Sequence, residues 1–270
     1  MLVDFHYHLA DSPGALDELL KDMDASGVEW TLLMSGPTGA WWDFKKCGFA
    51  PNEAVAKAVK AHSDRLIGNV YSDPQEKDAL GTLKKYLDAG FRAVKMWPPA
   101  GYFPDDDRCM PLYEEIEKRG VPLLVHTGQT NILIKGGDPS KRLATDSRFA
   151  HPFHLDKLSR QFPTVAFVMA HSGYPHYLEA WSMAHANQNV YLDISGSGPW
   201  TDGIPLFYNA IGGQNFIPID FERVLWGSDN CMPQAEHMAQ MSNAVRQMGA
   251  KKKDRANVFG DNAKRLLKIS

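Results

Sequence analysis

The 270-residue sequence has little of several features that mark specialised classes of protein. It has only three cysteines, Cys47, Cys109 and Cys231, with no CxxC spacing. This pattern excludes a disulfide framework and is typical of a reducing compartment, so we expect a cytoplasmic protein. It also lacks an apolar run near 18 residues and a charged segment followed by an apolar run. We therefore expect neither a membrane span nor a secretory leader.

Charge of one sign is equally scarce. The net charge is −3, and the basic run KKK at 251–253 is short. Composition thus predicts neither a nucleic-acid partner nor a membrane partner. No glycine-rich phosphate-binding fingerprint follows the first apolar run, which counts against a dinucleotide-binding open sheet. No repeat or linker is visible, so we interpret residues 1–270 as a single domain.

What the sequence does contain is a series of short apolar runs rich in Val, Ile and Leu, separated by helical stretches. Such runs, bounded by Gly, Pro, Ser or Asp, are typical of parallel strands buried on both faces. They span residues 1–8, 28–36, 65–73, 91–99, 121–128, 165–173, 189–198 and 223–230. Helical stretches span 15–27, 52–64, 76–90, 109–120 and 155–163. At about 34 residues per strand–helix unit, the α/β pattern predicts a (β/α)8 TIM barrel rather than a doubly wound sheet.

Two histidines lie two residues apart in the first predicted strand. In an extended strand Asp4, His6 and His8 share one face, whereas Phe5 and Tyr7 share the other. An HxH pair alone is a weak signal for a metal site, because a strand with one polar face explains it better.

Polar residues also end four other predicted strands. Lys95, His126, His171 and Asp229 end the fourth, fifth, sixth and eighth strands. The carboxyl ends of barrel strands converge on one face, where neutral imidazoles and a carboxylate are the ligands that a divalent cation such as zinc prefers. Each residue alone fits an ordinary buried or turn position, but together they predict a metal site. The long connections at 129–164 and 196–222 are expected to form its wall or lid.

At these residues the sequence resembles the amidohydrolase superfamily, and within it amidohydrolase family 2, which includes aminocarboxymuconate-semialdehyde decarboxylase-like enzymes. The resemblance covers nearly the whole chain. Its motifs are DFHYH, GFRAVKMWPP, YFPDDD, PLYEEIEKRGVPLLVHTG, HPFHLDKLSRQFPTVAFVMAHSGYPHYLEA, VYLDISG, RVLWGSDN and VFGDNAKRLL.

The resemblance implies a ligand set. His6 and His8 match the ligands of the first strand, His126 matches that of the fifth, and Asp229 matches that of the eighth. His171 matches a histidine that binds a second metal in binuclear members and acts on the substrate in mononuclear ones. We expect zinc as the cofactor, with one ion; two ions, manganese and iron stay open.

Lys95 has two interpretations. It falls where binuclear members carry a carboxylated lysine that bridges two ions. The alternative is a lysine paired with a carboxylate inside the barrel. Accepting CO2 requires a neutral amine and hence a lowered pKa.

This constellation predicts an enzyme. Bound zinc lowers the pKa of a water molecule. Asp229 is placed to move the proton of that water to the leaving group, and His171 is placed to stabilise the negative charge that develops on the substrate. It suits hydrolysis of a small lactone, amide or related carbonyl compound. The alternative is a decarboxylase of an aromatic or muconate-type acid, and a barrel that binds a metal or small molecule without catalysis is a distant third.

Substrate contacts give a modest preference for hydrolysis. Family decarboxylases often hold a substrate carboxylate with an arginine after the second strand, and residues 35–51 contain none. The predicted substrate-binding residues are Trp41, Trp97, Tyr102 and Arg142. Members of the family are frequently dimers, so the resemblance suggests a homodimer, and the sequence itself leaves the oligomeric state open. Cys231 departs from the usual aromatic-proline sequence after the aspartate and is interpreted as a small, partly buried hydrophobe.

Overall fold

The structure is a computed structural model that describes residues 1–37, 39–42, 47–130, 133–134, 145–196 and 203–269. Eight strands form one sheet in the order β1-β2-β5-β6-β7-β9-β10-β11, with parallel pairing between neighbours. Their bounds are β1 Val3–His8, β2 Trp30–Met34, β5 Leu66–Tyr71, β6 Ala93–Met96, β7 Leu123–Val125, β9 Phe167–Met169, β10 Val190–Asp193 and β11 Val224–Leu225. Each lies within one of the eight predicted runs, and the predicted TIM barrel is confirmed.

The sheet closes into a nearly complete barrel where its last strand meets its first. Phe5 N donates a hydrogen bond to Trp226 O at 3.0 Å, and Asp229 N donates one to His6 O at 2.7 Å. These bonds span the seam between β11 and β1. They bring the end of the eighth strand against the histidines of the first.

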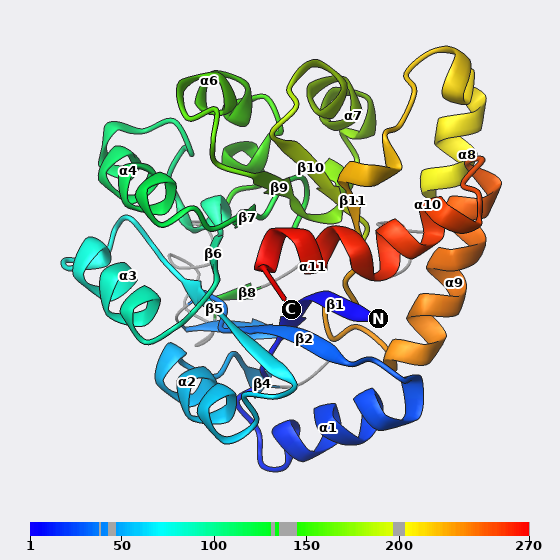
Figure 1. Cartoon of the computed structure of the whole chain (residues 1–270). Coiled ribbons are helices and arrows are strands. Elements are labelled where there is room, and N and C mark those ends of the chain that lie inside the picture. Colours follow the sequence, from blue (N-terminus) through cyan, green and yellow to red (C-terminus); the bar gives the residue numbers. More distant parts are fainter. Residues whose placement is uncertain (38, 43–46, 131–132, 135–144, 197–202, 270) are drawn as a thin grey trace.

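Helices surround the strands (Figure 1). In α1, Ala15, Leu19 and Met23 recur every four residues and form the buried face, as expected for an amphipathic helix. The first four predicted helical stretches contain α1, α2, α3 and α4, and the fifth overlaps α6, which begins one residue earlier, at His154. The helix bounds are α1 Ala15–Ser26, α2 Asn52–Ala61, α3 Ala79–Asp88, α4 Met110–Arg119, α6 His154–Gln161, α7 Tyr177–Ala186, α8 Gly203–Ala210, α9 Gln234–Gln247, α10 Lys252–Ala256 and α11 Asn262–Leu267.

The interior of the barrel is apolar at one end. Phe5, Leu124 and Val168 from three strands pack in one buried cluster with Ala263 and Leu267 of α11. Figure 1 shows α11 lying across the barrel beside both termini. That end is therefore filled, and the polar strand ends gather at the opposite, carboxyl-terminal mouth.

The sequence did not predict a second, smaller sheet. Antiparallel strands β4 (Cys47–Gly48), β3 (Ala40–Trp42) and β8 (Leu133–Ile134) pair in that order. They link the connection after β2 to the connection after β7. Strands of two or three residues carry no readable apolar periodicity, which is why these segments read as loops. Among the residues that the structure describes, no helix is long and apolar enough to cross a membrane.

Candidate metal centre

An irregularity in β1 sets the direction of its side chains. Asp4 pairs with Thr31 and Tyr7 with Leu33, so three residue steps in β1 face two in β2. One extra residue reverses the in–out alternation. The prediction that Phe5 and Tyr7 share a face was therefore wrong: Phe5 packs inside the barrel, whereas Tyr7 packs in the outer core.

The same irregularity separates Asp4 from the two histidines. Asp4 Oδ2 accepts hydrogen bonds from Ser228 Oγ at 2.6 Å and from Gln234 Nε2 at 2.9 Å. Asp4 thus ties β1 to the end of β11 and to the start of α9, and the prediction that it shares a face with the histidines was wrong. His6 and His8 remain together at the mouth.

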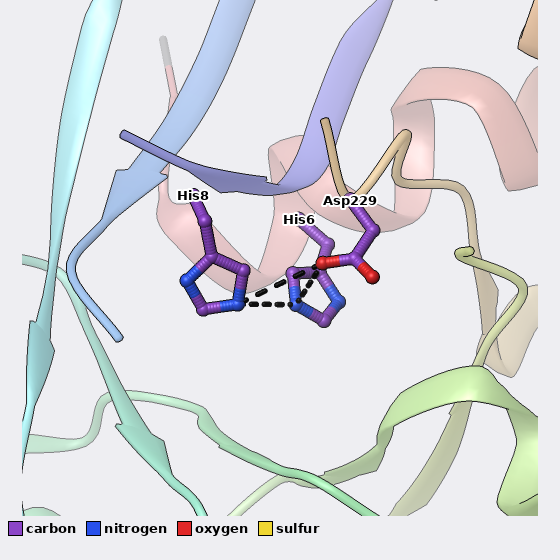
Figure 2. Close-up of side chains that lie close together, drawn as sticks. All are labelled: His6, His8 and Asp229. Carbon is purple, nitrogen blue, oxygen red and sulfur yellow. Dashed lines mark hydrogen bonds and ion pairs between the residues drawn. The ribbon is translucent and has the colours of Figure 1, made fainter. Parts of the chain in front are cut away.

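Three predicted ligands converge there (Figure 2). His6 Nε2 lies 3.2 Å from His8 Nε2 and 3.3 Å from Asp229 Oδ1, and His8 Nε2 lies 3.7 Å from the same oxygen. Ligand atoms around a tetrahedral zinc ion, with bonds of about 2.0–2.1 Å, lie about 3.3–3.4 Å apart. The three atoms therefore have the spacing of one coordination sphere.

Hydrogen bonds on the far side of each ring fix the protons of the two histidines. His6 Nδ1 lies 2.6 Å from Asp193 Oδ2, and His8 Nδ1 lies 2.7 Å from Ser35 O. A carbonyl and a carboxylate oxygen only accept, so both Nδ1 atoms carry the proton. Both Nε2 lone pairs then face Asp229 Oδ1, an arrangement that a cation stabilises. The donor set fits a divalent metal ion.

Burial gives these groups the charge states that a metal needs. It lowers the pKa of His6 and His8 well below the usual value, and nearby charge on Lys95 adds to the effect. Both rings are therefore neutral near pH 7. Burial raises the pKa of Asp229, although the attraction of Lys95 opposes the shift. A bound cation favours the ionised carboxylate and acts against that rise.

Lys95 enters the same site from β6. Its side chain is fully buried, and its Nζ lies 3.1 Å from His6 Nε2. Burial lowers the pKa of Lys95, although Asp229 and Asp193 attract its proton. In the described part of the chain, no carboxylate lies within ion-pair distance of Nζ. The ammonium instead donates to the lone pair that faces the proposed metal position.

His126 and His171 lie beside this group without belonging to the three-atom set. Their ring centroids are 4.9 Å apart, and those of His171 and His6 are 5.3 Å apart. Among the described residues, His126 Nε2 is buried with no hydrogen-bond partner. A buried lone pair or proton of this kind is rare in folded proteins and points to a missing partner.

The protonation of His171 follows from Ser195. His171 Nδ1 lies 3.3 Å from Ser195 O and 3.0 Å from Ser195 Oγ, whose own proton goes to Asp193 Oδ2 at 2.7 Å. His171 Nδ1 is therefore the donor, and the neutral ring leaves Nε2 unprotonated. Burial and the charge on Lys95 lower the pKa of His171 to about 4. The neutral ring therefore presents the lone pair of Nε2, whereas the predicted role in stabilising negative charge requires a proton on that nitrogen.

The backbone is strained at both strand ends that carry these groups. His171 and Ser172 have φ of 58° and 49°, and Asp229 and Asn230 have φ of 55° and 53°. Non-glycine residues rarely adopt this region, and functional sites concentrate such strain. Just before Asp229, a Cβ on Gly227 would lie 2.4 Å from His6 Cβ, so only glycine lets β11 approach β1 this closely.

The predicted substrate-binding residues have different surroundings. Trp97 is buried with its ring centroid 6.1 Å from that of His126, and within the described structure its Nε1 has no partner. Tyr102 is buried, and its Oη accepts a hydrogen bond from Trp97 N at 3.0 Å, so it positions that backbone. The backbone of Trp41 belongs to β3, but its side chain lies outside the described parts, as does all of Arg142.

Sequence reasoning missed Asp193 and Ser195. Both are fully buried and join His6 to His171 through the hydrogen bonds above. The signal was present, since Asp193 ends the apolar run of the seventh strand just as the predicted ligands end theirs. Cys231 lies at the rim, with its Sγ 3.7 Å from Asp229 Oδ2.

A sequence model of the family described as amidohydrolase matches residues 3–269. Among curated proteins, the protein fluG of Emericella nidulans is 32% identical over 108 residues, which is 40% of this chain and 11% of fluG. The match therefore spans only a small part of that relative.

Solved structures share the fold. An uncharacterised TIM-barrel protein from Bordetella bronchiseptica has a TM-score of 0.74 at 22% identity, covering 99% of this chain and 98% of that one. A dihydroxybenzoic acid decarboxylase from Polaromonas sp. JS666, with bound manganese and the inhibitor 2-nitroresorcinol, has a TM-score of 0.65 at 16% identity, covering 99% and 97%. A probable 2-pyrone-4,6-dicarboxylic acid hydrolase from Acinetobacter baumannii, with citric acid bound, has a TM-score of 0.64 at 15% identity, covering 99% of each chain.

Proposed function

This chain belongs to the amidohydrolase family, and from that premise we propose that it is a metal-dependent hydrolase of a small lactone, amide or related carbonyl substrate. The observation that carries the proposal is the convergence of His6 Nε2, His8 Nε2 and Asp229 Oδ1 with both rings held in the metal-binding tautomer. A divalent cation bound there polarises a carbonyl and lowers the pKa of a water towards neutrality.

The protein's own groups then move the protons. Asp229 Oδ1 faces the histidines, which leaves Oδ2 to accept a proton from the attacking water and deliver it to the leaving group. The Asp229 side chain is 16% exposed at the mouth, so its carboxylate is within reach of a substrate. His6 and His8 hold the cation, and Asp193 holds His6.

Trp97 is proposed to bind the substrate. Its indole N–H is buried without a partner in the described structure, and leaving a donor unpaired costs about 1–3 kcal/mol. A substrate oxygen that accepts this hydrogen bond recovers that energy on binding. Replacing Trp97 with Phe is then expected to raise KM more than it lowers kcat.

Zinc is the proposed metal, because two imidazoles and a carboxylate at near-tetrahedral spacing are the donors that it prefers. Manganese is the second candidate, since the Polaromonas decarboxylase carries it. His126, His171 and Lys95 form a proposed second cation position. Its support is the buried, unpartnered Nε2 of His126 beside the unprotonated Nε2 of His171.

Metal content provides the first test. We expect wild type to retain zinc or manganese after dialysis, and His6→Ala and Asp229→Asn to lose it. His185→Asn, an exposed histidine at the end of α7, is the matched control and is expected to keep the metal. Normal metal content in His6→Ala would contradict the proposal. A ratio of two ions per chain that falls to one in His126→Ala supports the second position.

Substrate panels separate hydrolysis from decarboxylation. Hydrolysis of a lactone or N-acyl compound in ¹⁸O-labelled water incorporates the label into the product. The decarboxylase alternative is favoured by the solved decarboxylases of this fold, and it predicts CO2 release from an aromatic or muconate-type acid without label. Two sequence observations support hydrolysis: residues 35–51 contain no arginine, and Lys95 occupies the fourth strand.

A further inference from the structure

A second group of ligand atoms, distinct from the set at the metal centre, comes from the turn before α6 and from the start of α7. His151, His176 and Glu179 each offer one nitrogen or oxygen, and these atoms lie within 4.8 Å of one another. His151 lies in the turn between the 3-10 helix at Ser147–Ala150 and α6, whereas His176 immediately precedes α7. Helices α6 and α7 are neighbours in the ring (Figure 1).

The spacing within α7 favours joint binding of one ion. His176 and Glu179 are three residues apart, so their side chains lie on one face of the first turn. His176 Nδ1 is 3.7 Å from Glu179 Oε1, and the ring centroids of His176 and His151 are 4.4 Å apart. Ligand atoms around a tetrahedral zinc ion lie about 3.3–3.4 Å apart. A small rotation of these side chains therefore brings their three donor atoms to the spacing of one coordination sphere.

The charges around this group also favour a cation. Phe153 N donates a hydrogen bond to His151 Nδ1 at 3.3 Å, and an ion bound at His151 Nε2 leaves this contact in place. His154 lies nearby, but its Nδ1 is 3.3 Å from Asp105 Oδ1. Glu179 is thus the carboxylate that faces the two imidazoles. The side chains of His176 and Glu179 are 40% and 33% exposed, which gives water access to the remaining coordination positions.

We propose that His151, His176 and Glu179 bind a divalent transition-metal ion such as zinc, at a site separate from the metal centre. Two imidazoles and one carboxylate suit zinc, cobalt and nickel. An ion held there joins the segment before α6 to the start of α7.

The ion acts as a clamp next to a catalytic segment. His176 N donates to Gly173 O at 2.7 Å, and Tyr174 N donates to His171 O at 3.1 Å. The chain from His171 to His176 is therefore short and internally bonded. A ligand that binds only the folded state stabilises it by an amount that grows with the logarithm of the ratio of free ligand to dissociation constant, so zinc raises the melting temperature through this site.

The test uses zinc alone and a background in which the metal centre is disabled. The triple variant His6→Ala, His126→Ala, Asp229→Asn, which also removes a ligand of the proposed second cation position, is titrated with zinc by calorimetry, and bound zinc is measured after dialysis. Three variants are made separately in this background: His176→Asn, Glu179→Gln and, as the matched control, His185→Asn. Both replaced ligands are partly exposed, so the fold is expected to be retained, and circular dichroism verifies it.

We expect one equivalent of zinc in the background protein and in the His185→Asn control, with a zinc-dependent rise in melting temperature. His176→Asn and Glu179→Gln should each weaken binding by roughly a hundredfold, because loss of a supporting partner alone costs about 10–100-fold. Absence of a saturable equivalent in the background, or an unchanged dissociation constant in both ligand variants, would overturn the proposal. If one of these variants unfolds, the other gives the decision.

Discussion

Replacing Asp193 with Asn tests whether the metal centre depends on the carboxylate behind His6. Asp193 Oδ2 lies 2.6 Å from His6 Nδ1 and accepts the Ser195 Oγ proton at 2.7 Å. The amide keeps the shape but removes the charge that makes Nε2 basic. Loss of such a partner weakens metal binding by about 10–100-fold, which is about 1.4–2.7 kcal/mol.

The same change has a separate effect on the metal-free fold. Burial raises the pKa of Asp193 from 3.8 to about 6. Above that pH the folded protein contains an ionised, buried carboxylate, which lowers its free energy of unfolding. The penalty grows between the two pKa values, is fully present at pH 8, and amounts to about 3 kcal/mol. Asn removes it, while the lost hydrogen bonds cost about 1–3 kcal/mol. The stability of the metal-free protein at pH 8 should therefore change little.

The assay separates the two effects. Zinc affinity is measured at pH 8 by competition with a chromogenic chelator, and stability by urea unfolding with and without zinc. Asp220→Asn is the matched control, because Asp220 caps the turn before β11 through Glu222 N and Arg223 Nε, at the filled end of the barrel. Asparagine caps about as well as aspartate, so the control should lose only the surface ion pair with Arg223, less than about 1 kcal/mol, and keep its zinc affinity. A zinc affinity within twofold of wild type in Asp193→Asn would refute the reasoning.

Three further predictions concern the barrel seam, the outer layer and the metal itself. Gly227→Ala places a Cβ within 2.4 Å of His6 Cβ, so it should lower the free energy of unfolding, measured in urea, by about 1–3 kcal/mol and also lower the zinc content. Unchanged metal content would mean that the seam tolerates the methyl group. Tyr86→Phe removes the 2.5 Å hydrogen bond to Glu53 and should cost about 1 kcal/mol without altering metal content, and a change in metal content would contradict this separation. Chelation should abolish activity and lower the melting temperature by on the order of 10 °C, with zinc or manganese restoring both; activity that survives complete metal removal would exclude a metal-dependent reaction.

Local patterns in the sequence predicted most of the fold, because buried parallel strands leave continuous apolar runs. The same runs placed His126, His171 and Asp229 at strand ends, and barrel geometry supplied their convergence. The irregularity in β1 left no such trace. Whether Phe5 faces inward depends on the register with β2, which is a tertiary property.

Other features depended on contacts between distant segments. The small sheet forms because Trp41 pairs with Gly48 and Leu133 across the mouth. His151 and Glu179 are likewise brought together by the packing of the turn before α6 against the start of α7, and neither neighbourhood contains a recognisable metal motif. Functional residues can be predicted from the sequence when a rule of the fold, such as the convergence of strand ends, brings them together. They are missed when contacts between loops bring them together.

Lys95 connects the electrostatics of the site to its metal chemistry. Its ammonium donates to His6 Nε2 at 3.1 Å, the lone pair that the proposed metal needs, so lysine and metal compete for one nitrogen. Metal binding must then displace Lys95 or release its proton. Burial lowers the pKa of Lys95 to about 8, so release of its proton near neutral pH has only a small free-energy cost. The neutral amine that remains is able to accept CO2. Zinc affinity should therefore rise with pH through this range in wild type, and rise less steeply in Lys95→Met. Equal pH dependence in the two proteins would show that the lysine and the metal do not compete.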